Sequence, residues 1–244
     1  MDVPGRLREL GFSERDSRIL AHHFLAAEAA GKTGHGLSRV EWLATQEFDP
    51  QASPERVVAE EGYERWEGRG AVGYLTLAAI CRTQAAHPPS HTRVIVAAET
   101  FPTGMLGYWV RRLAEGGLVA ALTTTSPRRL AHPDGGPKLT GTNPLAIGIP
   151  STDGHPVVSD VSMSKAPHGD VIAGLASPED VRPFGGEQAY KSFALAVGLQ
   201  LLVDSLTGGG YGAVMLVARP ESDPVPALRK LADGVRLPGD RARG

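Results

Sequence analysis

The sequence predicts an α+β protein in which helices come first and strands then mix with helices. Residues 13–30 and 37–45 carry apolar residues at helical spacing. From residue 91 onward, apolar segments of strand length, such as 91–99 and 211–220, are separated by helical patterns. This order predicts an N-terminal helical module followed by a region in which a sheet and helices are combined.

The individual elements follow from periodicity and from their flanking residues. Ser13 is suited to cap the first helix and Gly31 to end it. Further helices are expected at 37–45, 71–86, 104–116, 186–206 and, as a terminal segment, 226–237. Strands are expected at 91–99, 118–125, 145–150, 156–162 and 211–220. Residues 46–70 are polar, contain Pro50 and Pro54, and are expected to be irregular.

Composition is that of an ordinary globular chain and argues against several classes of partner. The 244 residues are 41% hydrophobic and 21% charged, with a net charge of −2. This balance gives no electrostatic reason to expect a nucleic acid or an anionic membrane. No apolar run approaches the roughly 18 residues of a membrane span, and the first ten residues lack a secretory apolar core. We therefore expect a cytoplasmic protein, in which the single Cys81 is an inert core residue.

Common catalytic and phosphate-binding motifs are absent from the sequence. There is no GxGxxG after a strand, no GxxxxGK[ST] loop, no GxSxG and no HExxH. The histidines do not cluster at metal-ligand spacing, and the adjacent His22 and His23 would point about 100° apart on one helix. We expect no metal site.

A glycine-rich turn at 135–144 leads into the predicted strand at 145–150. Asn143 precedes a proline and is expected to be extended, whereas Gly141 would allow a ligand or another backbone to approach closely. Thr142 and Asn143 offer a hydroxyl and an amide at the start of the strand. Taken alone, the residues favour a loop whose polar side chains satisfy their own backbone, over a binding turn.

A histidine between two glycines is the second candidate site. His35 is flanked by Gly34 and Gly36, and Arg39 follows one helical turn later. An imidazole beside a guanidinium suits a small carboxylate substrate, because the arginine can hold the anion while the histidine moves a proton. A capping histidine and a surface arginine would explain the same residues.

Taken together, these segments resemble the malate/L-lactate dehydrogenase family, which is unrelated to the Rossmann lactate dehydrogenases. Residues 34–39 resemble its Ser-His-Gly-x-x-Arg motif, and Gly-Thr-Asn-Pro-Leu-Ala at 141–146 matches the family motif letter for letter. Other resemblances follow in the family's order: residues 104–108 resemble its Gly-x-x-Gly-Tyr helix start, and residues 160–164, which read Asp-Val-Ser-Met-Ser, resemble Asp-x-Ala-Thr-Ser. Lys-Ser-Phe-Ala-Leu-Ala at 191–196 resembles Lys-Gly-Tyr-Gly-Leu-Ala, and Pro-Gly-Asp-Arg at 238–241 resembles Pro-Gly-Glu-Arg. The resemblance covers nearly the whole chain.

The resemblance implies a fold, a cofactor and site residues. It implies an N-terminal helical domain at 1–68, on which the C-terminal segment 220–244 packs, and an α/β cofactor domain of non-Rossmann topology at 69–219. It implies a homodimer that binds NADPH or NADH and reduces a 2-oxo acid or a 2-imino acid. His35 would be the catalytic proton donor, and Arg39 would hold the carboxylate of a small substrate. The cofactor-binding residues would be Thr124, Thr142, Asn143, Asp160, Ser162, Ser164 and Lys191.

The chain departs from the family pattern at several points. Pro102 occupies the position of a second family histidine, and proline cannot donate a proton. Gly34 replaces the serine before His35, while Ser192 and Ala194 replace glycines after Lys191. The segment between the 160–164 motif and the lysine helix is short, with only residues 168–187 in place of a long excursion.

These departures leave more than one function open. The first is NAD(P)H-dependent reduction of a cyclic imine, because an imine is readily protonated and requires less of a general acid than a ketone. The departures favour a specialised biosynthetic pathway over central metabolism. The alternative is a non-redox descendant, an isomerase, cyclase or lyase that acts on an imino or keto acid without hydride transfer. A non-catalytic binding subunit would not require His35 and Arg39.

Overall fold

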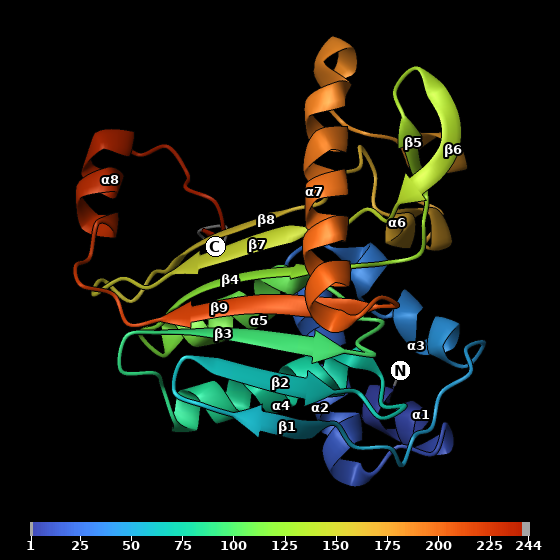
Figure 1. Ribbon diagram of the computed structural model, residues 1–244, viewed down its shortest axis with the longest axis horizontal. Coiled ribbons are helices and arrows are strands. Elements are labelled where there is room, and N and C mark those ends of the chain that lie inside the picture. The colour runs from blue at the N-terminus through green and yellow to red at the C-terminus, as the bar shows by residue number, and fades with distance from the viewer. Residues whose placement is uncertain (1, 241–244) are drawn as a thin grey trace.

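A seven-stranded, mainly antiparallel sheet forms the centre of the protein (Figure 1). The computed structural model describes residues 2–240. The strand order is β1-β2-β3-β9-β4-β7-β8, with β2 and β3 parallel and the other described pairs antiparallel. The strands are β1 (Glu55–Ala59), β2 (Tyr63–Glu67), β3 (Thr92–Ala98), β9 (Gly212–Ala218), β4 (Val119–Thr124), β7 (Leu145–Ile149) and β8 (Val157–Val161). This arrangement confirms the predicted α+β class and its non-Rossmann topology.

Six of the described helices correspond to predicted segments, whereas Val3–Glu9 and His168–Ile172 were not predicted. They are α1 (Val3–Glu9), α2 (Glu14–Ala29), α3 (Ser38–Leu43), α4 (Gly73–Ala86), α5 (Leu106–Glu115), α6 (His168–Ile172), α7 (Ala189–Thr207) and α8 (Val225–Ala232). Short 3₁₀ turns are η1 (Thr33–His35), η2 (Pro178–Asp180) and η3 (Gly186–Gln188). The Ser13 side chain caps α2 as predicted, accepting a hydrogen bond from the Asp16 N–H. None of the helices within residues 2–240 is long and apolar enough to cross a membrane.

Helices lie on both faces of the sheet. Successive side chains of a strand point to opposite faces, so each strand contributes residues to the packing on both sides. Met215 of β9 belongs to the main core together with Trp109 of α5. On the opposite face, Ala196 of α7 packs in a separate small cluster with Leu130 and Met163. Figure 1 shows α4 and α5 behind the sheet and α7 across its front.

The polar segment 46–70 contains two strands, which corrects the expectation of irregular structure. In β2, Glu64 is 1% exposed and occupies a position that an apolar residue would normally hold. Its carboxylate accepts hydrogen bonds from Trp66 Nε1 and Gln84 Nε2, both at 2.9 Å, and lies 3.4 Å from Arg93 Nη1. The strand was not predicted because an analysis of apolar periodicity counts a charged residue as exposed. Glu64 is instead buried, with its carboxylate paired and hydrogen-bonded.

The glycine-rich segment is only partly a turn. Residues Gly135–Thr140 form β6, which pairs with β5 (Leu130–His132) in a two-stranded hairpin outside the main sheet. Gly135 and Gly136 adopt φ of 103° and 104°, a conformation that non-glycine residues rarely adopt. The connection to β7 therefore begins only at Gly141.

The proposed division into domains at residue 68 stays a prediction, but two observations bear on it. Leu7 of α1 and Phe24 of α2 share one hydrophobic core with Trp109, and β1 and β2 belong to the main sheet. The C-terminal segment forms hydrogen bonds from Arg111 Nη2 to the Gly239 carbonyl and from the Val158 N–H to the Pro238 carbonyl. Figure 1 shows α8 on the side of the sheet away from α1 and α3, so the described residues 220–240 do not pack on the N-terminal helices as predicted.

Candidate active site

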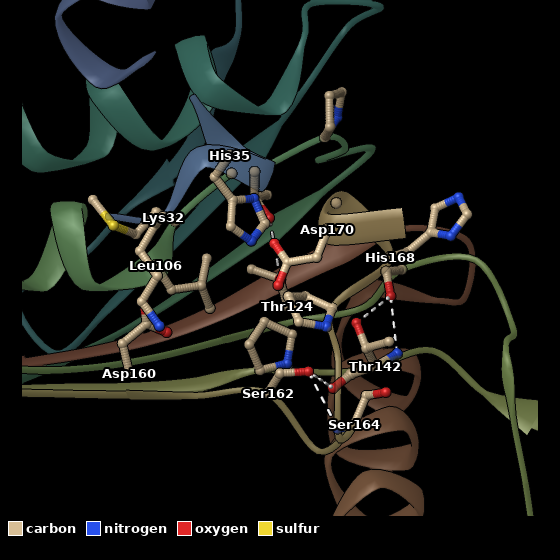
Figure 2. Close-up of a pocket in the computed structure, with 18 of the residues that line it drawn as sticks. Lys32, His35, Leu106, Thr124, Thr142, Asp160, Ser162, Ser164, His168 and Asp170 are labelled. Carbon is tan, nitrogen blue, oxygen red and sulfur yellow. Dashed lines mark hydrogen bonds between the residues drawn. The ribbon is translucent and has the colours of Figure 1, made fainter. Parts of the chain in front are cut away.

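A cavity of about 640 Å³ lies where η1, α3 and α6 meet the ends of β4 and β8. It has the size of a typical small-molecule or cofactor site. Most of the site residues predicted from the sequence line it: His35, Arg39, Thr124, Thr142, Asp160, Ser162 and Ser164. Figure 2 shows how these segments, distant in the sequence, converge on the same space.

Asn143 and Lys191 lie outside the lining of this cavity. Asn143 is fully buried, and its Nδ2 donates to the Ala196 carbonyl (3.1 Å) and to Gln200 Oε1 (2.9 Å), so it ties the start of β7 to α7. Its φ is +26° rather than extended, which corrects the expectation drawn from Pro144; asparagine tolerates this region, and its side-chain bonds hold it there. Lys191 is exposed on α7, where its Nζ donates to Gln188 Oε1 at 2.6 Å.

The His35 imidazole is neutral over the physiological pH range. The residue ends η1, between Gly34 and Gly36, and its ring points into the cavity (Figure 2). Burial, together with the positive charges of Arg39 and Lys32, lowers the pKa of His35 to about 3. A neutral imidazole can accept a proton at one nitrogen and donate a hydrogen bond from the other.

Arg39 is held as a binding group with free donors. It is 7% exposed, its Nε donates to the Gly34 carbonyl at 2.8 Å, and its guanidinium stacks 4.8 Å from the centre of the Trp42 ring. Burial lowers the pKa of Arg39, with Tyr74 and Asp170 opposing the effect, but a guanidinium stays charged in proteins. Neither Nη makes a hydrogen bond or an ion pair within the described part of the chain, so the fork is available to an anion.

Asp170 is a site residue that the sequence analysis missed. It lies on α6, inside the shortened segment, and lines the cavity with His35. A Cβ added to Gly34 would overlap the Asp170 carboxylate, so the glycine at position 34 is required by this contact. Figure 2 shows the Asp170 carboxylate beside the His35 ring. The side chain accepts no hydrogen bond from the residues described, which leaves a carboxylate free to meet a ligand.

Hydroxyl groups form another part of the lining. The Ser126 hydroxyl accepts a hydrogen bond from the Thr142 N–H at 3.1 Å, and Ser162 Oγ donates to the Thr142 carbonyl at 3.4 Å. Ser164 Oγ is directed to the Ala166 carbonyl at 2.7 Å and supports the loop. Thr124 Oγ1 lies 3.2 Å from Thr103 Oγ1.

Asp160 has a structural role as well as a place in the lining. Its Oδ2 accepts a hydrogen bond from the Gly107 N–H at 2.8 Å, in the first turn of α5, where a negative charge is favoured. Burial raises the pKa of Asp160, and the bond from Gly107 and the charge of Lys32 oppose this effect. A Cβ on Gly107 would meet this carboxylate within 3.0 Å.

The cavity as a whole suits an anionic ligand. Lys32, Arg39, Arg129 and Lys165 contribute positive charge, whereas Asp160 and Asp170 are the carboxylates in the lining. Pro102 also lines it, at the position where the family resemblance implied a second histidine. Proline itself offers no proton donor at that position.

Comparison with known proteins identifies the family. The profile described as malate/L-lactate dehydrogenase matches residues 3–181. The chain belongs to the malate/L-lactate dehydrogenase family. Its relatives include the Δ1-pyrroline-2-carboxylate/Δ1-piperideine-2-carboxylate reductase of Pseudomonas putida, 31% identical over 233 residues, covering 82% of this chain and 67% of the relative. The (2R)-3-sulfolactate dehydrogenase (NADP(+)) of Chromohalobacter salexigens is 30% identical, covering 84% of this chain and 69% of the relative.

Solved structures show the same fold. The Δ1-piperideine-2-carboxylate reductase of Pseudomonas syringae aligns with a TM-score of 0.82 at 24% identity, over 98% of this chain and 88% of that one. The malate dehydrogenase of Pyrococcus horikoshii aligns with a TM-score of 0.81 at 19% identity, over 95% and 77%. This family member spans about two thirds of the length of its curated relatives. The family consists of NAD(P)H-dependent oxidoreductases, which confirms the predicted family, enzyme class and cofactor class.

Proposed function

We propose that this protein is an NAD(P)H-dependent reductase of a small carboxylate-bearing substrate, either a cyclic 2-imino acid or a 2-oxo acid. The observation that carries the proposal is that His35, Arg39 and the hydroxyl-bearing residues of the cofactor motifs line one cavity. The relatives named as reductases of cyclic imino acids and as a sulfolactate dehydrogenase support it. Its pathway would be a specialised biosynthetic one.

The cavity fits a reduced nicotinamide dinucleotide. Its volume of about 640 Å³ is sufficient for the nicotinamide end of the cofactor and a small acid, and Lys32 and Arg129 make no ion pair within residues 2–240. The Thr142 hydroxyl offers a neutral polar group in the same lining. Bound NAD(P)H would supply the hydride. The chain's own residues then have to bind the acid, orient it and provide one proton.

Arg39 is suited to binding and orienting the substrate carboxylate. Its stem is buried and its Nε is fixed on the Gly34 carbonyl, so both Nη atoms can meet a carboxylate as a fork with little loss of entropy. Such a charge-assisted bond contributes about 1.5–3 kcal/mol. A buried guanidinium without an anion is also unfavourable, which adds to the drive for substrate binding.

His35 would receive its proton only when the anion is bound. In the empty cavity its pKa is about 3, because of burial and the charges of Arg39 and Lys32. A carboxylate paired with Arg39 cancels part of that positive charge and raises the pKa of His35. The imidazolium can then give its proton to the imine nitrogen or the keto oxygen as the hydride reaches the adjacent carbon.

Asp170 favours the imine over the ketone as substrate. Its free carboxylate beside His35 would stabilise a protonated C=N group, which carries a positive charge, whereas a neutral ketone gains nothing from it. Pro102 supplies no second acid, and an iminium needs none. Asp170 and Pro102 therefore both favour an imine as the substrate.

The steady-state rate with NADPH or NADH tests the proposal directly. We expect turnover of Δ1-piperideine-2-carboxylate to exceed that of pyruvate, and His35→Ala to lower kcat by about 10² to 10⁴. Arg39→Gln should raise KM with less effect on kcat. A protein that binds neither nucleotide at millimolar concentration would not be a reductase of this class.

We also propose that the protein acts as a homodimer in the cytoplasm. Support for a partner comes from α7, whose Leu195, Leu201 and Leu202 are 54%, 59% and 45% exposed. Large apolar side chains exposed together on one helix are typical of a protein–protein contact. Sedimentation equilibrium of the wild type and of Leu201→Asp tests this part, since a dimer formed through α7 should dissociate in the variant.

A non-redox descendant is the second candidate. Pro102, Ser192, Ala194 and the short 168–187 segment favour it, since each removes a feature associated with the cofactor or the second acid. An isomerase, cyclase or lyase of this kind would convert an imino or keto acid without nucleotide. It would still require His35.

A further inference from the structure

A second cavity, of about 340 Å³, adjoins the first. The two cavities share Arg129, Lys165 and Phe184 in their linings. One wall of the second cavity comes from the β5–β6 hairpin and the other from residues 181–189, which lead into α7. Figure 1 shows this hairpin standing beside α7, away from the helical core. A ligand in the first cavity can therefore extend into the second.

The second cavity is strongly basic. Arg129, Lys138, Lys165 and Arg182 line it, and none of the described carboxylates does so. Lys165 pairs with Asp180 at 2.7 Å, but the other three cations form no salt bridge within the described ranges of the chain. Cations gathered without counter-ions repel one another, so an anion of high charge would be bound there favourably.

Arg129 shows most clearly that a counter-ion is missing. It is half-buried and lines both cavities, and burial and the nearby Arg39 charge lower its pKa. Its backbone N–H is bonded to the Thr140 carbonyl, which fixes the stem, while its guanidinium has no partner among residues 2–240. A partly buried, unpaired arginine is costly unless a ligand pairs with it.

We propose that the second cavity binds the 2′-phosphate of NADPH and that the protein consequently prefers NADPH to NADH. The inference rests on the proposed function, which places the nicotinamide end beside His35. Lys138 and Arg182, on opposite walls, would hold the phosphate as point charge and fork, respectively. Phe184 is 37% exposed at the junction and offers a face on which adenine can stack.

NADPH and NADH provide a matched pair of ligands for the test, because they differ only in that phosphate. The dissociation constant of each is measured by nucleotide fluorescence with the full chain, without substrate. Lys138 and Arg182 lie outside the first cavity and are exposed, so the double variant Lys138→Gln/Arg182→Gln should fold normally. The control, Arg82→Gln/Lys230→Gln, removes the same charge from exposed positions elsewhere.

The wild type should bind NADPH about 10- to 100-fold more tightly than NADH, which corresponds to two or fewer charge-assisted bonds. The double variant should lose most of that ratio with its NADH affinity unchanged, and the control should keep it. Equal affinity of the wild type for both nucleotides, or a ratio that survives in the double variant, would overturn the inference and leave the reductase proposal intact. Failure to bind either nucleotide would overturn both.

Discussion

Replacing His23 with phenylalanine should reduce how steeply the stability of the protein falls at acid pH. His23 is fully buried in α2, where its ring stacks on Trp109 with centroids 5.3 Å apart and contacts Tyr74 and Tyr108. Its Nε2 accepts a hydrogen bond from the Met105 N–H at 3.1 Å, beside the cavity wall. Burial lowers the pKa of His23 to about 3.

The magnitude follows from proton linkage. The unfolded chain binds a proton at this histidine below about pH 6.5. The folded protein does not do so until about pH 3. Because the unfolded state binds more protons in this window, stability is retained above pH 6.5 and lost as the pH falls toward 3. Lowering the pH from 7.5 to 5.0 should therefore reduce the free energy of unfolding by about 2 kcal/mol through this one group.

Urea unfolding at pH 7.5 and 5.0 measures the effect. The phenylalanine variant leaves the Met105 N–H unpaired, so its free energy of unfolding should be about 1–3 kcal/mol lower than that of the wild type from this cause at both pH values. The difference between the two pH values should nevertheless be about 2 kcal/mol smaller than in the wild type. The exposed His91→Gln serves as the control for removing an imidazole. An unchanged pH dependence in His23→Phe would refute the assignment of a neutral, buried histidine.

Three further predictions concern the site and its supports. Arg39→Gln should weaken the binding of a carboxylate substrate by about 10- to 100-fold and raise the pKa of His35, which the pH dependence of substrate binding would report. Gly148→Ala should destabilise the protein by about 1–3 kcal/mol in urea unfolding, because its Cβ would lie 2.6 Å from the Val110 carbonyl oxygen of α5. Lys191→Ala should leave the dissociation constant of NADPH unchanged, because the side chain lies outside both cavities; a large loss would restore the role implied by the family resemblance.

The sequence predicted most of the fold because burial and apolar pattern coincide in most elements. In β9, Ala213, Met215 and Val217 face the main core, and the segment was predicted as a strand. In β2 the pattern failed, because buried Glu64 is neutralised by partners distant in the sequence. Periodicity carries no information about such partners.

The site was predictable where a motif determines the local backbone and unpredictable where tertiary packing selects the side chain. Thr142 and Ser162 line the cavity as their motifs implied. Asp170 lies on a five-residue helix in the shortened segment, outside any recognised motif. Its position in the cavity depends on packing against Gly34, which the sequence does not indicate. Lys191 lies on the exposed side of α7, a rotation that the motif alone does not specify.

Hydride transfer is the central claim, and deuterium labelling tests it most directly. The protein is incubated with Δ1-piperideine-2-carboxylate and nicotinamide-deuterated NADPH, carrying the label on each face of the ring in turn, and the product is analysed by mass spectrometry. We predict that the reduced amino acid acquires deuterium from one of the two faces, and that His35→Ala forms the same labelled product about 10² to 10⁴ times more slowly. Conversion of the substrate to an unlabelled product, at a rate independent of the nucleotide, would contradict the account.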